Sequence, residues 1–303
     1  MTLSGWIIYN GMLPGDKFID FAQMFHEAAK KENIKTTIYK NNELLAYLTH
    51  DHLSILQNEN VTLPDFVIST DKDIYLAKLL ELLGVRVFNR ADIIHTSDDK
   101  ILTHQMLAKE NIRTPATIVS PKTYLEDVVI DHDLIDQVIE QLSLPLVIKE
   151  AFGSFGEQVY LVETKEQLIK QVKVIGNKPF IFQQFIASSY GKDLRLQVVG
   201  DEVVASMMRS SKNDFRANIT SGGSMEPYEA TEEEKQLAIK ATKAICADFA
   251  GVDLLFGEDG KPIVCEVNSN AHIRNMYTCT GINAAEYIIR YIKKQLTNKG
   301  DLS

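Results

Sequence analysis

The sequence contains few cysteines, and their spacing does not suit disulfide pairing or zinc binding. Its three cysteines, Cys246, Cys265 and Cys279, are odd in number and form no Cys-x-x-Cys pair. This pattern indicates neither a disulfide framework nor a zinc site. We expect reduced thiols that pack as small apolar side chains in a cytoplasmic protein.

The chain also lacks any long uncharged apolar run. Residues 1–9 have neither a basic segment nor an extended hydrophobic stretch, so they do not resemble a signal peptide. No later stretch is long enough to cross a bilayer. These absences predict a protein without a membrane partner.

Positive charge is in deficit as well. The 303 residues carry 32 Lys and Arg against 41 Asp and Glu, which gives a formal net charge of −9. Such a chain repels a polyphosphate backbone on average, so nucleic acid is not an expected partner. A local group of Lys and Arg can still bind a nucleotide. The length and an apolar content of 45% predict two or three lobes around a shared cleft.

Two common nucleotide-binding fingerprints and the usual nucleophile arrangements are missing. No Gly-x-x-x-x-Gly-Lys-Ser/Thr segment leads into a helix, and no Gly-x-Gly-x-x-Gly follows the first strand. Ser97, Ser154 and the histidines form no recognisable catalytic arrangement. His50 and His52 lack a third metal ligand and are expected in an exposed polar helix. A dinucleotide-dependent oxidoreductase is therefore the least favoured function.

What is present is an alternation of short apolar strands and amphipathic helices, which predicts an α/β fold. The first segment has expected strands at 6–9, 36–39, 66–68 and 85–88, with helices at 18–29 and 74–83. These elements suit a small parallel sheet. The second has a helix from Ser97 or Asp98, as its cap, to about 110, strands at 116–120, 146–149, 159–163 and 180–185, and helices at 134–142 and 167–174.

The third segment is predicted to contain two hairpins and two helices. The hairpins are 193–199 with 202–208 and 252–256 with 263–267, and the helices are 231–249 and 283–296. Thr231 and Glu234 form a capping box at the start of the longer helix.

The second hairpin places three polar side chains together. Counting outward from a turn at Asp259-Gly260 puts Asp253 opposite Glu266, and Asn268 faces the same side as Glu266. Opposed carboxylates repel unless a cation lies between them, and oxygen ligands of this kind suit Mg²⁺. The alternative is an exposed sheet face whose polar residues contact solvent.

Two further segments suit anions. Lys149 ends an apolar strand before the loop Gly153–Gly156, where glycines let backbone N–H groups approach phosphate oxygens. The alternative is a flexible hairpin loop, although a buried ammonium favours an anion. Residues 208–218, with Arg209 and Arg216, form either an anion-binding loop or an exposed basic loop. Lys100, in the first turn of a helix, is by itself expected at the surface.

In this order the segments resemble the ATP-grasp superfamily, and specifically the RimK-type ligases that attach glutamate or another amino acid. The matching positions are Asp99-Lys100, Lys149 before the glycine loop, Gln184-Phe185-Ile186, Asp193, 214–218, Asp253 with Glu266 and Asn268, and 280–282. The resemblance implies an ATP-grasp fold in three parts. These are an N-terminal α/β domain (1–95), a central lid domain (96–186) and a C-terminal domain with the metal strands (187–303).

The resemblance also implies residue roles. Lys100 and Lys149 would contact ATP phosphates under a lid of Gly153, Ser154, Phe155 and Gly156. Gln184, Phe185 and Ile186 would meet adenine, and Asp193 the ribose. Arg209, Arg216 and Asn218 would steady the γ-phosphate and the acyl phosphate, with Arg209 and Lys149 acting in catalysis. Asp253, Glu266 and Asn268 would bind two Mg²⁺, or Mn²⁺ in their place.

The sequence departs from the RimK pattern in two places. Gln184 stands where a glutamate is common, and residues 268–275 lack a Ser-Pro-Gly-like loop. The second segment borders the acceptor site in the family. Asn270, His272 and Arg274, together with Arg209, are therefore candidate substrate contacts. The alternative is a loop ordered by its asparagine side chains.

We expect an ATP-dependent carboxylate–amine ligase that works through an acyl phosphate and releases ADP and phosphate. Its expected partners are ATP, an amino acid such as glutamate, a carboxylate acceptor that stays open, and further copies of itself. Two alternatives remain. One is a ligase for an amino-group carrier protein or a cofactor's glutamyl tail, and the other is a regulator that binds ATP without catalysis.

Overall fold

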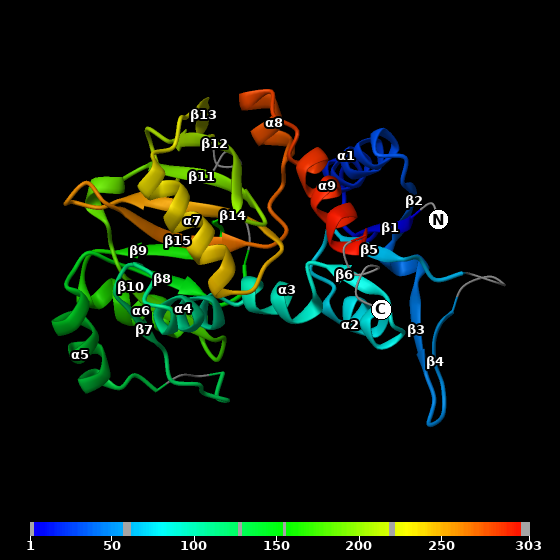
Figure 1. The fold of residues 1–303 in the computed structure, drawn as a ribbon. Helices are drawn as coiled ribbons and strands as arrows, with labels where there is room; N and C mark the ends of the chain where they lie inside the picture. The colour runs from blue at the N-terminus through cyan, green and yellow to red at the C-terminus, as the bar shows by residue number, and fades with distance from the viewer. Residues whose placement is uncertain (1–2, 57–61, 127–128, 154–155, 218–221, 298–303) are drawn as a thin grey trace.

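The computed structural model describes residues 3–56, 62–126, 129–153, 156–217 and 222–297. Within them, three larger sheets and one hairpin are joined by helices, and the N-terminal sheet lies to one side of the other two (Figure 1). No helix in the described residues is long and apolar enough to cross a membrane.

The N-terminal sheet is parallel, as predicted. Its strand order is β2-β1-β5-β6, and helices α1 and α2 pack against it. The elements are β1 (Ser4–Tyr9), α1 (Lys17–Lys31), β2 (Lys35–Lys40), β5 (Phe66–Ser69), α2 (Ile74–Leu82) and β6 (Arg86–Phe88). Parallel strands end at one edge, so the loop after β5 points toward the rest of the molecule.

A short hairpin replaces the polar helix expected around His50 and His52. Strands β3 (Leu45–Leu48) and β4 (Leu53–Leu56) pair antiparallel, and both histidines lie exposed in the turn. The prediction of a helix was wrong. Because no residue of β3 is buried, the segment has no hydrophobic alternation that would reveal a strand.

The middle sheet is antiparallel, with the order β7-β10-β8-β9, and helices α5 and α6 bury their apolar faces against it. The elements are α3 (Ala91–Asp98), α4 (Lys100–Lys109), β7 (Thr117–Val119), α5 (His132–Leu142), β8 (Leu146–Glu150), β9 (Val159–Val162), α6 (Lys165–Ile175) and β10 (Phe180–Gln184).

The cap of helix α4 differs from the prediction. Asp99 is the capping residue, and its carboxylate accepts from the backbone N–H groups of Ile101 and Leu102. Ser97 and Asp98 instead end helix α3, and the Ser97 hydroxyl donates to the carbonyl of Val267 at 3.0 Å. The sequence shows one polar run here, and it does not reveal that two helices meet within it.

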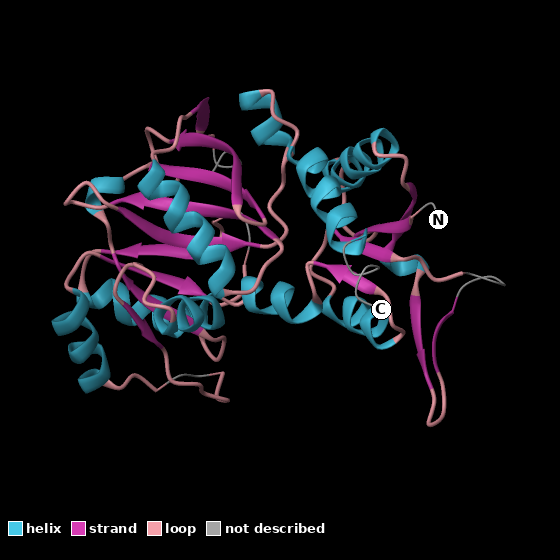
Figure 2. Cartoon of the chain, viewed as in Figure 1, coloured by secondary structure: helices cyan, strands magenta, loops and turns pink. Residues whose placement is uncertain are grey.

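The third sheet has the order β13-β12-β11-β14-β15 and carries helix α7 on one face (Figure 2). The elements are β11 (Lys192–Val199), β12 (Glu202–Ser210), β13 (Ser224–Pro227), α7 (Glu232–Ala244), β14 (Phe249–Phe256), β15 (Pro262–Asn268), α8 (Arg274–Thr280) and α9 (Ala284–Thr297). The opposite face carries the polar side chains described below.

Helix α7 begins as predicted and ends earlier. The capping box of Thr231 and Glu234 is present. The helix stops at Ala244, because Cys246 takes a positive φ of 58° that the helix cannot continue through. Phe249, predicted as the last helical residue, instead starts β14 and is buried.

The last helix shares a core with the first. Phe21 and Phe25 of α1 belong to one hydrophobic cluster with Ile288, Ile289 and Ile292 of α9. Figure 1 shows α9, in red, beside α1, in blue. Two ion pairs between these segments, Lys31–Glu286 and Lys293–Glu32, border the apolar contact.

Candidate active site

Two carboxylates meet across the hairpin of β14 and β15. Asp253 and Glu266 are direct partners in the sheet register, and Asn268 lies two residues further along β15. All three line one cavity. The sequence prediction of this pairing is therefore confirmed, although its counting assumed an unbroken ladder.

The ladder is broken by a β-bulge at Cys265. Leu254 pairs with Val264, whereas Asp253 pairs with Glu266, so Cys265 is the extra residue. Val264 and Val267 are buried in the core beneath α7. As a result the consecutive residues Cys265 and Glu266 both line the cavity.

Asp253 is held by two arginines. Arg195, its partner on β11, donates from Nε to Oδ1 at 2.7 Å and from Nη2 to Oδ2 at 2.6 Å. Arg209 donates to Oδ2 at 2.8 Å. Burial opposes the charge of Asp253, but these two guanidinium groups lower its pKa below the usual value. The carboxylate is therefore ionised and fixed.

Arg209 in turn is held by Asp193. Its Nε and Nη2 atoms donate to the two carboxylate oxygens of Asp193 at 2.6 and 2.7 Å. Asp193 lines the cavity, and its geometry makes it a support for Arg209 as well as a candidate ribose contact. Sequence reasoning missed Arg195. Arg195 lies two residues after Asp193 in a predicted strand, so the sequence could have shown that both side chains lie on one face.

These groups fit a hard divalent cation. A carboxylate has about four lone-pair positions, and the arginines use three on Asp253, which leaves one on Oδ1. Glu266 has only a distant cation, Lys100 Nζ, at 4.0 Å. Asn268 Nδ2 is buried without a hydrogen-bond partner in the described part of the chain. Two carboxylates and one amide leave several positions of Mg²⁺ for phosphate and water.

The candidate cation site contains two carboxylates, Asp253 and Glu266. Across the described ranges, no three His, Cys, Asp or Glu side chains come together as a metal-binding group. A cation at Asp253 and Glu266 would therefore depend on the amide of Asn268 and on ligands from outside the protein.

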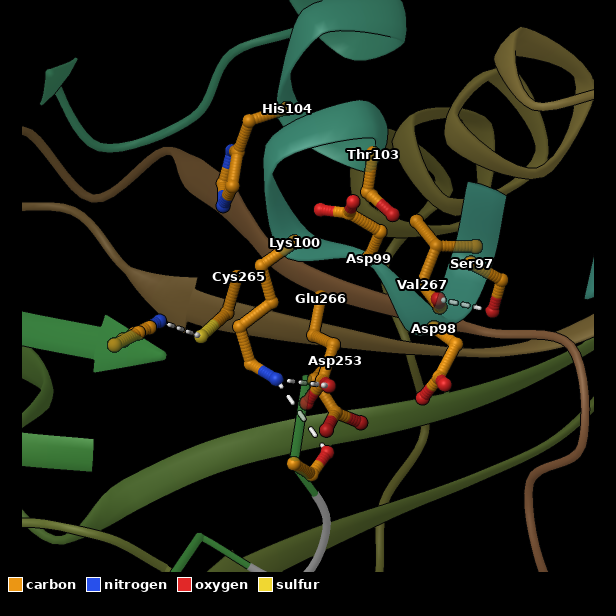
Figure 3. Close-up of polar contacts among 12 residues, drawn as sticks. Ser97, Asp98, Asp99, Lys100, Thr103, His104, Asp253, Cys265, Glu266 and Val267 are labelled. Carbon is orange, nitrogen blue, oxygen red and sulfur yellow. Dashed lines mark hydrogen bonds and ion pairs between the residues drawn. The ribbon is translucent and has the colours of Figure 1, made fainter. Parts of the chain in front are cut away.

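Two lysines point to the same place. From its position in the first turn of a helix, Lys100 was expected at the surface, but its side chain is only 12% exposed. Its Nζ lies 3.5 Å from the carbonyl oxygen of Gly153, and Figure 3 shows it directed at Glu266 and Asp253. Lys149 Nζ donates to Cys265 Sγ at 3.5 Å.

The charges of these two lysines affect the pKa of His104, which is buried nearby. Burial, followed by repulsion from Lys149 and Lys100, lowers its pKa to about 3. It is therefore neutral at physiological pH, and its Nε2 lies 3.0 Å from Nε2 of Gln183, which lines the cavity.

The cavity as a whole suits an anion. Its volume is about 440 Å³, within the usual range for small-molecule sites. Among the residues that the structure describes, seven cationic side chains line it against four carboxylates. The cations are Lys72, Lys100, Lys149, Lys192, Arg195, Arg209 and Arg216, and the carboxylates are Asp71, Asp193, Asp253 and Glu266. This local excess of positive charge stands out in a chain with a net charge of −9.

The expected lid and hinge residues border the same cavity. Gly153, Gly156, Gln184, Phe185 and Ile186 line it, whereas Ser154 and Phe155 lie outside the described residues. A Cβ on Gly153 would come within 2.4 Å of Gln158 Oε1, so a side chain there would displace its neighbour.

Arg216 joins two of the predicted anion-binding segments. Its guanidinium pairs with Asp214 and donates to the carbonyl oxygens of Gly156 and Val159. It therefore fastens the 211–217 loop to the glycine loop, where it also lines the cavity. Asn218, predicted beside it, lies outside the described residues.

The candidate substrate contacts divide into two groups. Asn270 and His272 line the cavity, and His272 packs against Phe21 with ring centroids 4.6 Å apart. Burial and the charges of Lys17 and Arg195 lower the pKa of His272 to about 4.

Arg274, the other candidate substrate contact, lies apart from this cavity. It starts α8 and pairs with Asp20 of α1, with its side chain 43% exposed, and it does not line the cavity. Helix α8 could not be predicted, because its seven residues are too few for a helical period to show.

Comparison with known proteins agrees with this geometry. Residues 97–292, most of the chain, match the model of the RimK-like ATP-grasp domain. The chain is 29% identical to human N-acetylaspartylglutamate synthase A, over 93% of this chain and 73% of that protein. It is 36% identical to the ribosomal protein bS6–L-glutamate ligase of Escherichia fergusonii, over 72% of this chain and 70% of that protein.

Solved structures share the fold at low identity. The crystal structure of D-cycloserine synthetase covers 97% of this chain and 99% of its own, with a TM-score of 0.73 at 13% identity. A D-alanine–D-alanine ligase from Bacillus anthracis covers all of both chains, with a TM-score of 0.71 at 17% identity. This likeness confirms the mixed α/β fold expected from the sequence. This chain belongs to the RimK-like ATP-grasp family.

Proposed function

We propose that the chain is an ATP-dependent carboxylate–amine ligase. One observation carries the proposal: Asp253, Glu266 and Asn268 face Lys100 and Lys149 across a single positively charged cavity. Such an arrangement suits the phosphates of a nucleotide and the divalent cation that accompanies them.

The proposed reaction has two steps. A substrate carboxylate oxygen attacks the γ-phosphorus of ATP, and the bond from that phosphorus to the β-phosphate oxygen breaks. ADP leaves, and the carboxylate becomes an acyl phosphate. An amine nitrogen then attacks the acyl carbon, loses a proton and displaces phosphate. Mg²⁺ would neutralise phosphate charge when bound. Arg209, held by Asp193, would stabilise the transferring group, while Lys149 and Lys100 would orient the phosphates.

The substrates are proposed from the named relatives. The names of the human synthase and the bacterial ligase both include glutamate, so we propose L-glutamate as the amine. The carboxylate acceptor would be either a small N-acylated amino acid or a protein tail. We further propose two Mg²⁺ ions and the three lobes 1–95, 96–186 and 187–303.

Replacing Glu266 tests the function. Glu266→Gln keeps the shape of the side chain and removes the charge that a cation needs. We expect glutamate-dependent ADP release to fall by at least about 100-fold. The assay would use N-acetylaspartate and a glutamate-ended peptide as acceptors, and a thermal melt would show that the variant is folded.

Glu258→Gln is the matched control. Glu258 lies exposed in the turn of the same hairpin and does not line the cavity, so its rate should equal that of the wild type. Wild-type turnover in Glu266→Gln would refute the cation site. A wild-type protein that binds ATP but releases no ADP with any acceptor would instead favour the regulator.

A further inference from the structure

One end of the cavity is built by the N-terminal lobe. Phe18, Thr70, Asp71 and Lys72 line it there, beside Asn270 and His272 of the C-terminal segment. Lys149 and the metal strands come from the other two sheets, and Lys100 comes from the start of α4. The N-terminal end is therefore the part of the cavity left for the substrates.

The loop after β5 is fixed beside the metal strand. Asn270 Nδ2 donates to the carbonyl oxygens of Ser69 and Asp71, both at 2.9 Å. Asn270 is two residues from Asn268, a separation of at most about 7 Å along the chain. The Thr70 backbone N–H and hydroxyl both donate to the carbonyl of Ile8, which holds the loop from the other side. Asp71 is thus placed within a small substrate's length of the metal ligands.

Asp71 has a neutral partner where a cation would be expected. Its Oδ2 accepts from Asn10 Nδ2 at 3.0 Å, and the described residues offer it no ion pair. Lys72, the next residue, pairs with Asp98. Burial is the main cause that raises the pKa of Asp71. The backbone N–H and the charge of Lys72 lower that pKa, but burial outweighs them, so a ligand cation in direct contact would stabilise this half-buried carboxylate further.

His272, which lines the same end of the cavity, adds no positive charge there at neutral pH. That ring is neutral and stacks on Phe21, with Phe18 at its edge. Lys17 lies near enough to influence His272, and Arg195 is committed to Asp253. The end of the cavity therefore combines the carboxylate of Asp71 with a partly aromatic wall and with Lys72, which pairs with Asp98.

We propose that Asp71 binds the ammonium group of the amine substrate and holds it next to the site of acyl phosphate formation. The proposal rests on the ligase function and names a binding residue for it. It also gives a role to the hydrogen bonds from Asn270 to the backbone of the loop after β5, because these bonds hold Asp71 in place. Loss of a charge-assisted contact of this kind is worth about a 10- to 100-fold change in affinity.

Asp71→Asn tests the proposal, because it preserves the shape of the side chain and its contact with Asn10. We expect the KM for L-glutamate to rise by at least about 10-fold, with the KM for ATP within about 2-fold of the wild type. Hydroxylamine serves as a second nucleophile, because it is neutral and needs no carboxylate to hold it. Hydroxamate formation from the same acceptor should stay within about 2-fold of the wild-type rate.

Asp73→Asn is the matched control. Asp73 lies in the same loop, caps α2 by accepting from Leu76 N, and does not line the cavity. Its kinetics should be unchanged with both nucleophiles. Asp71→Ser provides a second substitution should the first one fold poorly.

The outcomes separate the two proposals. An unchanged KM for glutamate in Asp71→Asn would overturn the role of Asp71 and leave the ligase function intact. An equal loss with glutamate and hydroxylamine would show a structural role and would also overturn it. A wild-type enzyme without amine-dependent turnover would refute the ligase function, and the role of Asp71 with it.

Discussion

At the scale of single residues, the cavity contains charges that fix one another before any ligand arrives. Asp193, Arg209, Asp253 and Arg195 form a continuous chain of bidentate and single contacts between 2.6 and 2.8 Å. Fixed charges stabilise a transition state more effectively than charges that must first reorient. Glu266 is outside this chain, so it is the carboxylate most able to adjust to a bound cation.

A buried histidine gives a prediction for stability against pH. His104 has a pKa of about 3 in the folded protein and about 6.5 when unfolded. Between these values the unfolded state binds more protons, so the free energy of unfolding falls as the pH drops below 6.5. The contribution at about pH 5 is a loss of about 2 kcal/mol relative to neutral pH.

We expect His104→Gln to lose less stability than the wild type between about pH 7.5 and pH 5, measured by urea unfolding. His52→Gln, at an exposed position of the β3–β4 turn, should keep the wild-type pH dependence. Identical slopes for His104→Gln and the wild type would contradict the prediction.

Site residues could be predicted from the sequence where strand alternation and a turn placed them relative to one another. The pairing of Asp253 with Glu266 followed from a hairpin, and both were found in one cavity. Burial of Lys100 could not be predicted, since it depends on contacts with the glycine loop between β8 and β9 and with Glu266 of β15. Arg195 was overlooked because a strand arginine alone does not show which carboxylate faces it on the next strand.

At the scale of elements, the β14–β15 hairpin shows how a correct result came from an incomplete count. The sequence located the turn region, but it did not show that Cys265 is an extra residue in the ladder. Bulges leave no composition signal unless they contain glycine. The cost of missing it was small here, because Glu266 and Asn268 share the cavity face as expected, and only residues before the bulge, such as Val264, changed face.

Helix α7 gives a prediction at this scale. Thr231→Ala removes the side chain that accepts from the Glu234 backbone N–H. The free energy of unfolding should fall by about 1 kcal/mol. ADP release should not change, because α7 packs against the face of the sheet opposite the cavity.

Thr231→Ser keeps the hydroxyl and should retain most of the stability, as measured by urea unfolding. A loss in the serine variant as large as that in the alanine variant would show that the methyl group, rather than the cap, is responsible.

Elements with a clear period were predicted well, and those without one were not. Helices α1, α5 and α6 and the parallel strands of the first sheet were all located, since each buries one face or a continuous apolar run. The β3–β4 hairpin and helix α8 are too short or too exposed to produce a period. The end of α7 depends on the backbone of Cys246, which composition does not indicate.

At the scale of the whole molecule, the two ends of the chain stabilise each other. Ile289 of α9 is fully buried in the cluster that also contains Phe21 and Phe25 of α1. Ile289→Ala should therefore lower the free energy of unfolding by about 3 kcal/mol. Hydrogen exchange should also rise in α1 and β1, more than two hundred residues earlier in the chain.

Lys294→Ala is the control, because Lys294 lies exposed on the same helix. Its stability should stay within about 0.5 kcal/mol of the wild type. Protection of α1 and β1 that is unaffected by Ile289→Ala would show that the N-terminal sheet is stable without α9.

The shared core of α1 and α9 also bears on the order in which the protein is made. The strands of the first sheet are translated by residue 88, yet α9, which packs against α1, is translated only after the other described elements. Until then, the apolar side of α1 has no permanent cover, and exposed surface of this kind promotes aggregation. A nascent chain paused before residue 284 would therefore be a natural client for chaperones, and translation of α9 would end that exposure.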